Sequence, residues 1–377
     1  MQPRAVHSVS TKKHDFAIDK LTTNYTIINV PNNPMQGLII KSTGSSYLVH
    51  FPDGTQAECH VKGNFRIRGI RSTNPVAVGD HVEVATLSDG TNWITDVCER
   101  RNYIIRRSTN LSKESHILAA NIDQVVLLVT INHPVTSTTF IDRFLATCEA
   151  YRVPAVLLFN KIDLLDEAEL QALAELRTLY ESLGYSTYAL SAKTICTDEI
   201  EQFKQSLLYG KVTLLSGNSG VGKSTLLNAI FGRELARTGA ISNAHNKGTH
   251  TTTFSEMYPL TQCIMHNAQC TMQEENTEKI TSDLMSPSLR GAGESGGWII
   301  DTPGIKGFGT IDMQKEEIGH YFWEIFRISA DCRYSNCTHT GEPGCAVYQA
   351  ALDGTIAPSR FESYLSLLGD CTETKYR

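Results

Sequence analysis

One glycine-rich stretch has the spacing of a loop that binds phosphate groups. Residues 217–224 read G-N-S-G-V-G-K-S and match the pattern G-x-x-x-x-G-K-[ST] in full. Its glycines let backbone N–H groups and the next helix face a phosphate. Lys223 would reach the β- and γ-phosphates, and the Ser224 hydroxyl would bind Mg²⁺. The expected nucleotide contacts are Gly217, Asn218, Ser219, Gly220, Val221, Gly222, Lys223, Ser224 and Thr225. The alternative is a glycine turn that matches by chance.

Two shorter motifs indicate that the base is guanine. Residues 160–163 read N-K-I-D, and the Asp163 carboxylate could accept hydrogen bonds from N1–H and the 2-amino group of guanine. Adenine lacks this donor pair, and binding it would cost about 1–3 kcal/mol or more for the unsatisfied carboxylate. Asn160 would brace the loop, and the Lys161 stem would pack on the ring. In the motif Ser191, Ala192 and Lys193, the backbone N–H of Ala192 would bind guanine O6. The alternative for N-K-I-D is a polar turn between a strand and a helix.

Two further stretches could complete a magnesium site. Residues 301–304 read D-T-P-G, where Asp301 would hold Mg²⁺ through water and the Gly304 N–H would contact the γ-phosphate. Upstream, residues 248–253 read G-T-H-T-T-T, and Thr251 or Thr252 would supply the remaining ligand. The spacing does not choose between these threonines. The alternative is a solvated threonine-rich loop.

The order of these motifs is unusual. A conventional small GTPase has the phosphate loop first and the guanine motifs last, whereas here the guanine motifs come first. All motifs can still meet at one sheet edge if the old termini are joined and the chain is opened after D-T-P-G. The sequence therefore predicts a circularly permuted GTPase that binds GTP and GDP with Mg²⁺. The segment after Gly304 leads toward the C-terminal cysteines, which suggests that nucleotide state is coupled to that region.

Three cysteines and a histidine near the C-terminus have the spacing of a metal site. Cys332, Cys337, His339 and Cys345 follow the pattern C-x4-C-x-H-x5-C. Three sulfurs and one imidazole suit tetrahedral Zn²⁺, and a closed shell of four protein ligands predicts a structural ion. The alternative is one disulfide with a spare thiol. The nearby aromatic residues, Tyr321, Phe322, Trp323 and Phe326, are expected in the core.

Apolar runs that alternate with helical patterns must position the nucleotide motifs. Buried strands are expected at 125–130, 155–160, 212–216 and 298–300, with helices near 140–151 and 167–183 and from residue 223. Continuous apolar strands followed by amphipathic helices predict an α/β fold with a parallel sheet covered on both faces.

The N-terminal part has a different pattern. Between residues 37 and 107, short runs rich in β-branched and aromatic residues are separated by turn signals, which predicts a small antiparallel barrel of the OB type. The whole chain has a formal charge of −6, but residues 1–110 hold 13 Lys and Arg against 9 Asp and Glu. Eight of these basic residues punctuate the strands and the exit of the predicted barrel: Lys62, Arg66, Arg68, Arg71, Arg100, Arg101, Arg106 and Arg107. They form either a solvated basic face or an RNA-binding surface.

The length of 377 residues is too great for a single core. We expect a flexible arm over 1–35, an OB-like RNA-binding domain over 36–110, a permuted GTPase domain over 111–326, and a zinc-binding helical module over 327–377. The stretch 261–296 is an insertion, either a disordered surface loop or a second metal site. The polar start and the lack of a long apolar run predict a cytoplasmic protein with no membrane association. We also expect a monomer.

Taken together, these motifs resemble the ribosome small-subunit-dependent GTPase A family of bacteria over roughly residues 36–375. The resemblance rests on N-K-I-D and S-A-K ahead of the phosphate loop, T-H-T-T-T, D-T-P-G and the cysteine cluster. It implies a late maturation factor of the small (30S) ribosomal subunit that binds 16S rRNA and whose GTPase is stimulated by the subunit.

The resemblance also implies a role for His250 in hydrolysis. Ile305 follows D-T-P-G, where conventional GTPases carry a water-orienting glutamine, and an aliphatic side chain cannot position a nucleophile. The alternative is a solvated loop histidine. Two other functions stay open: a passive rRNA-binding scaffold with structural nucleotide, and an ATP-using enzyme, which Asp163 opposes.

Overall fold

The computed structural model describes residues 34–43, 46–61, 75–107, 115–235, 241–242, 247–248, 255–260, 296–302 and 313–373. Several predictions made from the sequence lie outside these residues. They concern the 1–35 arm up to residue 33, the 261–296 insertion up to residue 295, and the residues His250, Thr251, Thr252, Gly304 and Ile305.

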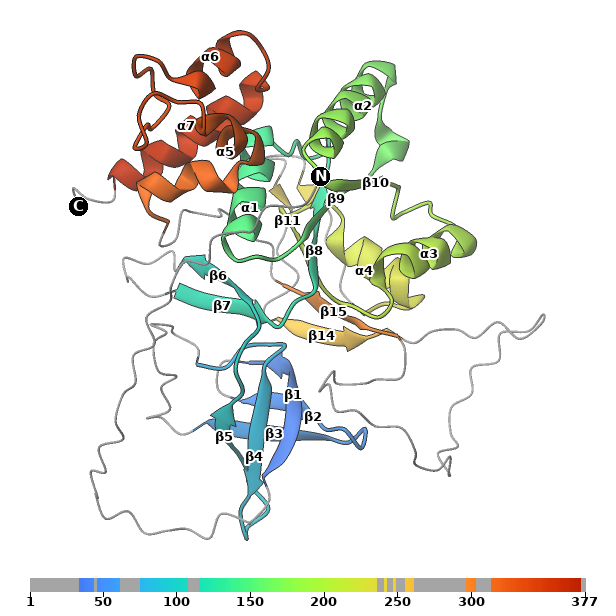
Figure 1. Ribbon diagram of the computed structural model, residues 1–377. Coiled ribbons are helices and arrows are strands. Elements are labelled where there is room, and N and C mark those ends of the chain that lie inside the picture. The colour runs from blue at the N-terminus through green and yellow to red at the C-terminus, as the bar shows by residue number, and fades with distance from the viewer. Residues whose placement is uncertain are drawn as a thin grey trace, which may run out of the picture.

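The N-terminal part is a five-stranded barrel, as predicted (Figure 1), although one of its strand pairs, β3 with β5, is parallel where an antiparallel barrel was expected. Its strands run in the order β1-β2-β3-β5-β4, and β4 pairs back with β1 to close the ring. Inward residues such as Ile39, Val49 and Val82 are fully buried. The strand bounds are β1 Met35–Ser42, β2 Tyr47–His50, β3 Gln56–Val61, β4 His81–Thr86 and β5 Asn92–Val97.

A hairpin that the sequence did not predict follows the barrel. It consists of β6 (Tyr103–Arg107) and β7 (Ser115–Ala120), paired antiparallel. The Asn121 side chain donates to Gly79 O at 2.9 Å, and Ala120 N donates to Val78 O at 2.9 Å. The hairpin therefore fastens the barrel to the start of the GTPase sheet.

The GTPase sheet has the order β10-β9-β8-β11-β15-β14, and all neighbours are parallel except β14 and β15. All six residues of β8 are buried, as expected of a central strand with both faces covered. The strands are β8 Gln124–Val129, β9 Ala155–Phe159, β10 Ser186–Ala189, β11 Val212–Gly217, β14 Glu256–Pro259 and β15 Trp298–Asp301. Two residue pairs, β12 (Ile241–Ser242) and β13 (Lys247–Gly248), form a separate ladder.

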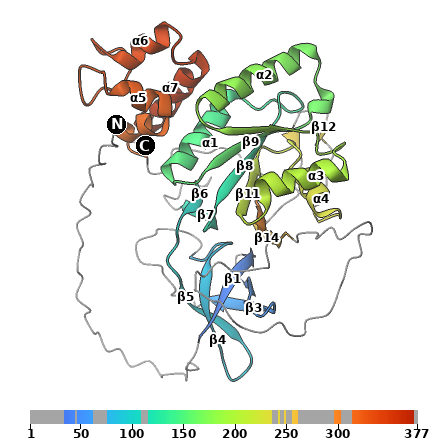
Figure 2. The ribbon, with the colours of Figure 1, turned by 45° about the vertical axis from the view of Figure 1, so that its right-hand side comes forward.

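Helices cover both faces of this sheet (Figure 2). Alternate residues of β8 point to opposite faces: Val125 and Leu127 share a core with α1 and α2, while Val126 and Leu128 share one with α3 and α4. The helices are α1 Thr138–Ala150, the 3₁₀ turn η1 Ile162–Leu164, α2 Glu167–Ser182, α3 Thr197–Phe203, the π-helical η2 Lys204–Leu208 and α4 Lys223–Phe231.

The C-terminal module has its own small core and packs on α1. It consists of η3 Lys315–Tyr321, α5 Trp323–Ser329, α6 Ala346–Leu352 and α7 Pro358–Glu373. Ala146 of α1 belongs to this core. Phe322 is buried as expected, but Trp323 and Phe326 are 51% and 46% exposed, so their assignment to the core was wrong.

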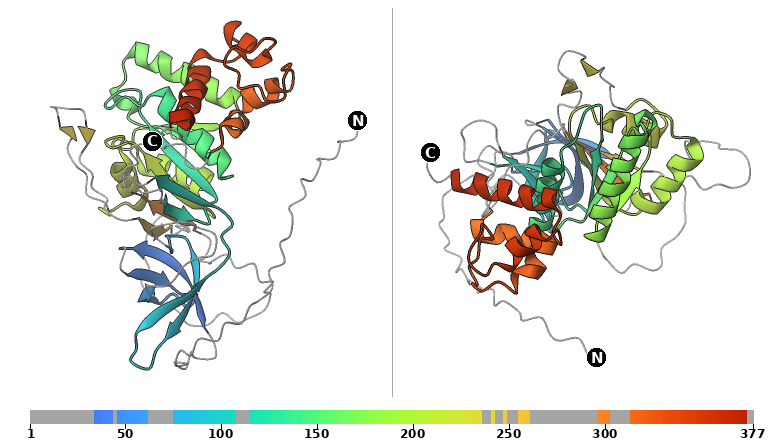
Figure 3. Two further views of the ribbon diagram at one scale, coloured as in Figure 1. Left: turned by 90° about the vertical axis from the view of Figure 1, so that its left-hand side faces the viewer. Right: turned by 90° about the horizontal axis from the view of Figure 1, so that it is seen from above.

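Figure 3 shows the barrel and the C-terminal helices at opposite ends of the GTPase sheet. The barrel and the sheet are hydrogen-bonded to one another, because β14 also pairs with β1 and joins both into one 11-stranded sheet. Within the described part of the chain, none of the helices has the length and apolar character needed to cross a membrane.

Candidate nucleotide site and metal centre

The nucleotide motifs meet where the parallel strands end. The phosphate loop follows β11, N-K-I-D follows β9, S-A-K follows β10, and Asp301 ends β15. In open α/β sheets this carboxyl edge is where ligands bind. The permuted chain order therefore produces one site from strands that lie side by side.

The phosphate loop depends on glycines at two close contacts. Gly217 has φ of +147°, and a Cβ there would lie 2.6 Å from Leu128 O. Gly222 has φ of +101°, and a Cβ there would lie 2.3 Å from the Asn160 amide nitrogen. Any larger residue would push the loop away from β8 or from Asn160.

Asn160 connects the guanine motifs to the phosphate loop. Its buried amide donates from Nδ2 to Val221 O at 2.8 Å and accepts at Oδ1 from the N–H of Ala192 at 2.9 Å. One side chain thus fixes three motifs relative to each other. The sequence predicted a bracing role, and the structure identifies its two partners.

Lys161 has a role that sequence reasoning missed. Its backbone is left-handed, with φ of 64°, and its ammonium donates to Gly220 O at 2.7 Å and to His133 O at 2.5 Å. Partial burial lowers the pKa of this lysine. The charged end of Lys161 thus connects the loop after β8 to the phosphate loop. Nothing around His133 in the sequence signals this contact.

The two guanine motifs contact each other through Ser191 and Asp163. The Ser191 hydroxyl donates to the Asp163 carboxylate, which orients that carboxylate at the start of η1. A pocket of about 730 Å³ opens beside them, lined also by Ile162, Thr194 and Phe203. Ser191 and Ala192 are buried, whereas Lys193 is exposed.

Lys223 lies at the mouth of the phosphate loop. Its ammonium donates to Gly217 O at 2.7 Å and Asn218 O at 3.0 Å. Burial lowers its pKa to about 8, although the nearby Asp301 carboxylate acts in the opposite direction. Asp301 is 3% exposed, and Thr302 donates to Leu215 O at 3.3 Å. A buried carboxylate beside a lysine and Ser224 at the start of α4 is a donor set that suits Mg²⁺ with nucleotide phosphates.

The predicted metal ligands also converge. One ligand atom from each of Cys332, Cys337, His339 and Cys345 lies within 4.8 Å of all the others. The Sγ atoms of Cys332 and Cys345 are 3.9 Å apart, and each lies 3.5–3.6 Å from Nδ1 of His339. A tetrahedral ion bonded at about 2.3 Å to sulfur and about 2.0 Å to nitrogen would space its ligands about 3.5–3.8 Å apart. All three cysteines are free thiols in the structure. The alternative of one disulfide with a spare thiol is therefore wrong for this structure.

Two of the basic residues near the barrel exit form ion pairs within the protein. The Arg100 guanidinium is buried and donates to both carboxylate oxygens of Asp80 at 2.6 Å, so it is not part of a basic surface. Arg101 pairs with Asp123 at 2.8 Å and is exposed. Lys62, Arg66, Arg68 and Arg71 lie outside the described residues, as do the side chains of Arg106 and Arg107.

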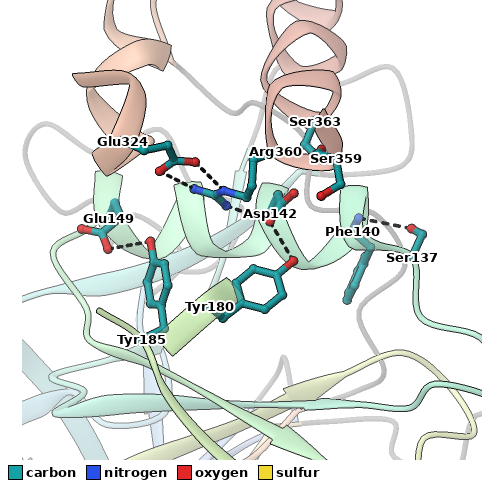
Figure 4. Close-up of polar contacts among 10 residues, drawn as sticks. All are labelled: Ser137, Phe140, Asp142, Glu149, Tyr180, Tyr185, Glu324, Ser359, Arg360 and Ser363. Carbon is teal, nitrogen blue, oxygen red and sulfur yellow. Dashed lines mark hydrogen bonds and ion pairs between the residues drawn. The ribbon is translucent and has the colours of Figure 1, made fainter. Parts of the chain in front are cut away.

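The C-terminal module is fastened to α1 by a network that the sequence did not reveal (Figure 4). Arg360 of α7, which is 1% exposed, donates to Asp142 of α1 at 2.7 Å and to Glu324 of α5 at 2.6 and 3.2 Å. Tyr180 of α2 donates to the same Asp142 oxygen at 2.9 Å. Four helices therefore share one buried charge cluster.

Comparison with known proteins places the chain in a family. A family model described as the RsgA GTPase matches residues 97–266, and one described as the RsgA N-terminal domain matches residues 36–94. The small ribosomal subunit biogenesis GTPase RsgA of Phocaeicola vulgatus is 54% identical over 344 residues, which cover 91% of this chain and 99% of that protein. Its counterpart in Porphyromonas gingivalis is 52% identical over 345 residues, with the same coverage.

Two solved structures share the fold. YjeQ from Thermotoga maritima superposes with a TM-score of 0.61 at 29% identity, covering 90% of this chain and 99% of that one. YloQ, described as a circularly permuted GTPase, superposes with a TM-score of 0.59 at 25% identity, covering 94% and 100%. The motif order, the sheet and these relatives agree, and the chain belongs to the RsgA family of circularly permuted GTPases.

Proposed function

We propose that this protein binds the small (30S) ribosomal subunit and hydrolyses GTP to GDP and phosphate during late subunit maturation. The observation that carries the nucleotide part is the position of Asn160, which joins the guanine motifs to the phosphate loop in one site. The relatives that are more than half identical are named small ribosomal subunit biogenesis GTPases, which supports the subunit as partner.

In this proposal the residues of the site have separate tasks. Asp163, held by Ser191, accepts the two guanine donors, and the Ala192 N–H donates to guanine O6. The phosphate loop and Lys223 bind the phosphates. Mg²⁺ is held by Ser224, by Asp301 through water and by Thr251 or Thr252, while Gly304 contacts the γ-phosphate.

Hydrolysis needs a water molecule in line with the γ-phosphate. The resemblance to the family implies that His250 places that water, and this fits the aliphatic Ile305 after D-T-P-G, which cannot position a nucleophile. Turnover of the free protein is then slow, and docking on the subunit accelerates it. The barrel binds 16S rRNA, and the protein acts as a cytoplasmic monomer.

The cysteine cluster holds one structural Zn²⁺. The spacing of the donor atoms of Cys332, His339 and Cys345 is close to that of a tetrahedral ion, Cys337 lies within 4.8 Å of them, and the donor set of three sulfurs and one imidazole fits zinc. Burial, reinforced by the neighbouring cysteines, raises the pKa of Cys337 to about 12, so a cation would be needed to keep this sulfur as a thiolate.

The decisive experiment is a GTPase assay with purified 30S subunits, purified 50S subunits and no subunit. We expect 30S subunits to raise turnover by more than about tenfold, and 50S subunits to have little effect. Absence of hydrolysis in all three conditions would instead support a passive scaffold. His250→Ala should abolish the stimulation, whereas His320→Ala, which changes an exposed histidine of η3, should not.

A further inference from the structure

The strand β1 uses one of its edges for two partners. Residues Met35–Leu38 pair with β4 and close the barrel, while Lys41 pairs with Glu256 of β14. The other edge of β1 is occupied by β2. The barrel therefore covers the edge of β14 that the GTPase sheet would otherwise leave open.

One transverse row of residues runs from the barrel to the nucleotide site. Lys41 of β1 lies opposite Glu256 of β14, which lies opposite Asp301 of β15. Asp301 in turn lies opposite Leu215 of β11, two residues before the phosphate loop begins at Gly217. Residues directly opposite one another share a face of the sheet. The side chains of Lys41, Glu256 and Asp301 therefore emerge on the same face.

The charges along this row depend on each other. Glu256 and Asp301 are two carboxylates in opposed positions, and like charges there destabilise a strand pair. The ammonium of Lys41 lies 3.2 Å from a carboxylate oxygen of Glu256 and offsets its charge. Both carboxylates also lie near Tyr258. Burial raises the pKa of this tyrosine, and the negative charges of Glu256 and Asp301 raise it further. The barrel thus supplies the positive charge that offsets Glu256, the β14 residue directly opposite Asp301.

A second contact connects the barrel to the other end of β15. The rings of His50 in β2 and Trp298 in β15 are 5.5 Å apart in an edge-on arrangement, and Trp298 is only 5% exposed. Ile39 of the barrel and Met257 of β14 belong to the same hydrophobic core as Trp298. β15 is therefore held by the barrel near its first residue and, through β14, at its last.

We propose that the barrel controls the nucleotide site through β14 and β15, with Lys41 and Glu256 as the positioning residues that couple the two. Binding of a ligand to the barrel then changes the geometry at Asp301, and the bound nucleotide changes how firmly the barrel is held. Coupling between two binding sites is reciprocal, so both directions can be measured. This inference rests on the proposed function, which assigns RNA to the barrel and GTP to the loop.

Exchanging the charges of Lys41 and Glu256 distinguishes coupling between the two sites from a merely structural role of this ion pair. The variants are Lys41→Glu, Glu256→Lys and the double exchange that restores an ion pair of opposite sense. The matched control is Arg101→Glu, because the Arg101–Asp123 pair also links the barrel exit to the GTPase sheet but lies at the start of β8, away from the row. Each variant is first checked for wild-type thermal unfolding.

The first measurement is hydrogen–deuterium exchange of the full-length protein with GDP and with a non-hydrolysable GTP analogue. Exchange in residues 34–43 should differ between the two nucleotides in the wild type, the double exchange and the Arg101→Glu control. Each single variant should reduce that difference at least about twofold. Exchange in β1 that is the same with both nucleotides in the wild type, or unaltered in the single variants, would overturn the inference.

The second measurement is the ratio of GTP turnover with and without small subunits. Each single variant should lower this ratio by about two- to fivefold, as expected for a partly exposed ion pair, and the double exchange should restore it. Loss in the single variants without recovery in the double exchange counts against the pair as the link. A wild type that hydrolyses GTP without stimulation would refute the proposed function, while the exchange measurement would still decide the coupling.

Discussion

Asn160 and Gly222 illustrate how closely single residues constrain each other in this site. The amide of Asn160 has both of its polar atoms engaged, one by the phosphate loop and one by Ala192. It has room for this because Gly222 has no Cβ, which would lie 2.3 Å from the amide nitrogen. The glycine of one motif is thus needed for the asparagine of another, 62 positions away in the chain.

Asp163→Asn should change which base is bound. The amide would present a donor where the carboxylate accepts, so the affinity for GTP should fall by about ten- to a hundredfold, corresponding to 1–3 kcal/mol. Xanthine carries an oxygen in place of the 2-amino group, so the variant should gain affinity for xanthosine triphosphate. Titration with fluorescent nucleotides measures both. A nucleotide preference that the substitution leaves unchanged would contradict the assignment of Asp163 to guanine, and a wild type that prefers ATP would favour an ATP-using enzyme.

Lys223 predicts a pH dependence of nucleotide binding. Its folded-state pKa of about 8 lies below the ordinary value, so the free protein loses this positive charge as the pH rises through 8. Bound phosphates favour the charged form, so binding takes up a proton above that pH. The GTP affinity should fall by up to about tenfold per pH unit there. Guanosine, which has no phosphates, serves as the control in the same calorimetric titration and should show no such fall.

At the scale of elements, α1 is the support on which the C-terminal module rests. Asp142 and Arg143 are neighbours on this helix, and each forms an ion pair with the module. The acidic Asp142 pairs with Arg360, and the basic Arg143 pairs with Asp370. The first pair is almost wholly buried, and the second is partly exposed. The guanidinium of Arg360 also lies 4.6 Å from the ring centre of Phe322. The buried pair therefore has the larger part in fixing the module.

Arg360→Met should destabilise the protein by about 3–5 kcal/mol, because it leaves the carboxylates of Asp142 and Glu324 buried without a cation. Arg143→Met removes the partly exposed pair on the same helix and should cost less than about 1 kcal/mol. Chemical denaturation followed by far-UV circular dichroism compares the two variants. Equal losses of stability in the two variants would show that the buried Arg360 cluster stabilises the protein no more than the partly exposed pair of Arg143.

The elements that the sequence predicted well are those with local signals. The phosphate loop, the strands around it and the cysteine cluster follow from spacing within short stretches, and the structure has them. The burial of Arg100 could not be predicted in this way. The local sequence does not show whether a basic residue faces solvent or pairs with a distant carboxylate such as Asp80. The pair of Arg360 and Asp142 spans 218 positions, and no local pattern marks it. The assignment of each site residue to a ligand atom stays a prediction.

At the scale of the whole molecule, the proposed structural Zn²⁺ predicts that folding of the C-terminal module depends on the metal. Its core is small, and Cys345 both belongs to the cluster and accepts the Tyr348 N–H at the start of α6 at 3.2 Å. Removal of the metal by a strong chelator should unfold residues 313–373 and reduce the helical signal. Nucleotide binding should persist, because its motifs lie on other strands. Added Zn²⁺ should restore the signal, and an unaltered spectrum of verified metal-free protein would contradict a structural role.

The permuted strand order also has a consequence for synthesis of the chain. The ribosome produces β8, β9 and β10 before β11, yet β11 is the neighbour that covers the free edge of β8. The fully buried β8, apolar in all residues but Gln124, therefore emerges with one edge unpaired until more than 80 further residues have been added. An open apolar edge in a growing chain invites wrong pairing with other chains. In a GTPase of conventional order the counterpart of β11, which precedes the phosphate loop, is made first, so the permutation creates an interval in which β8 waits for this neighbour.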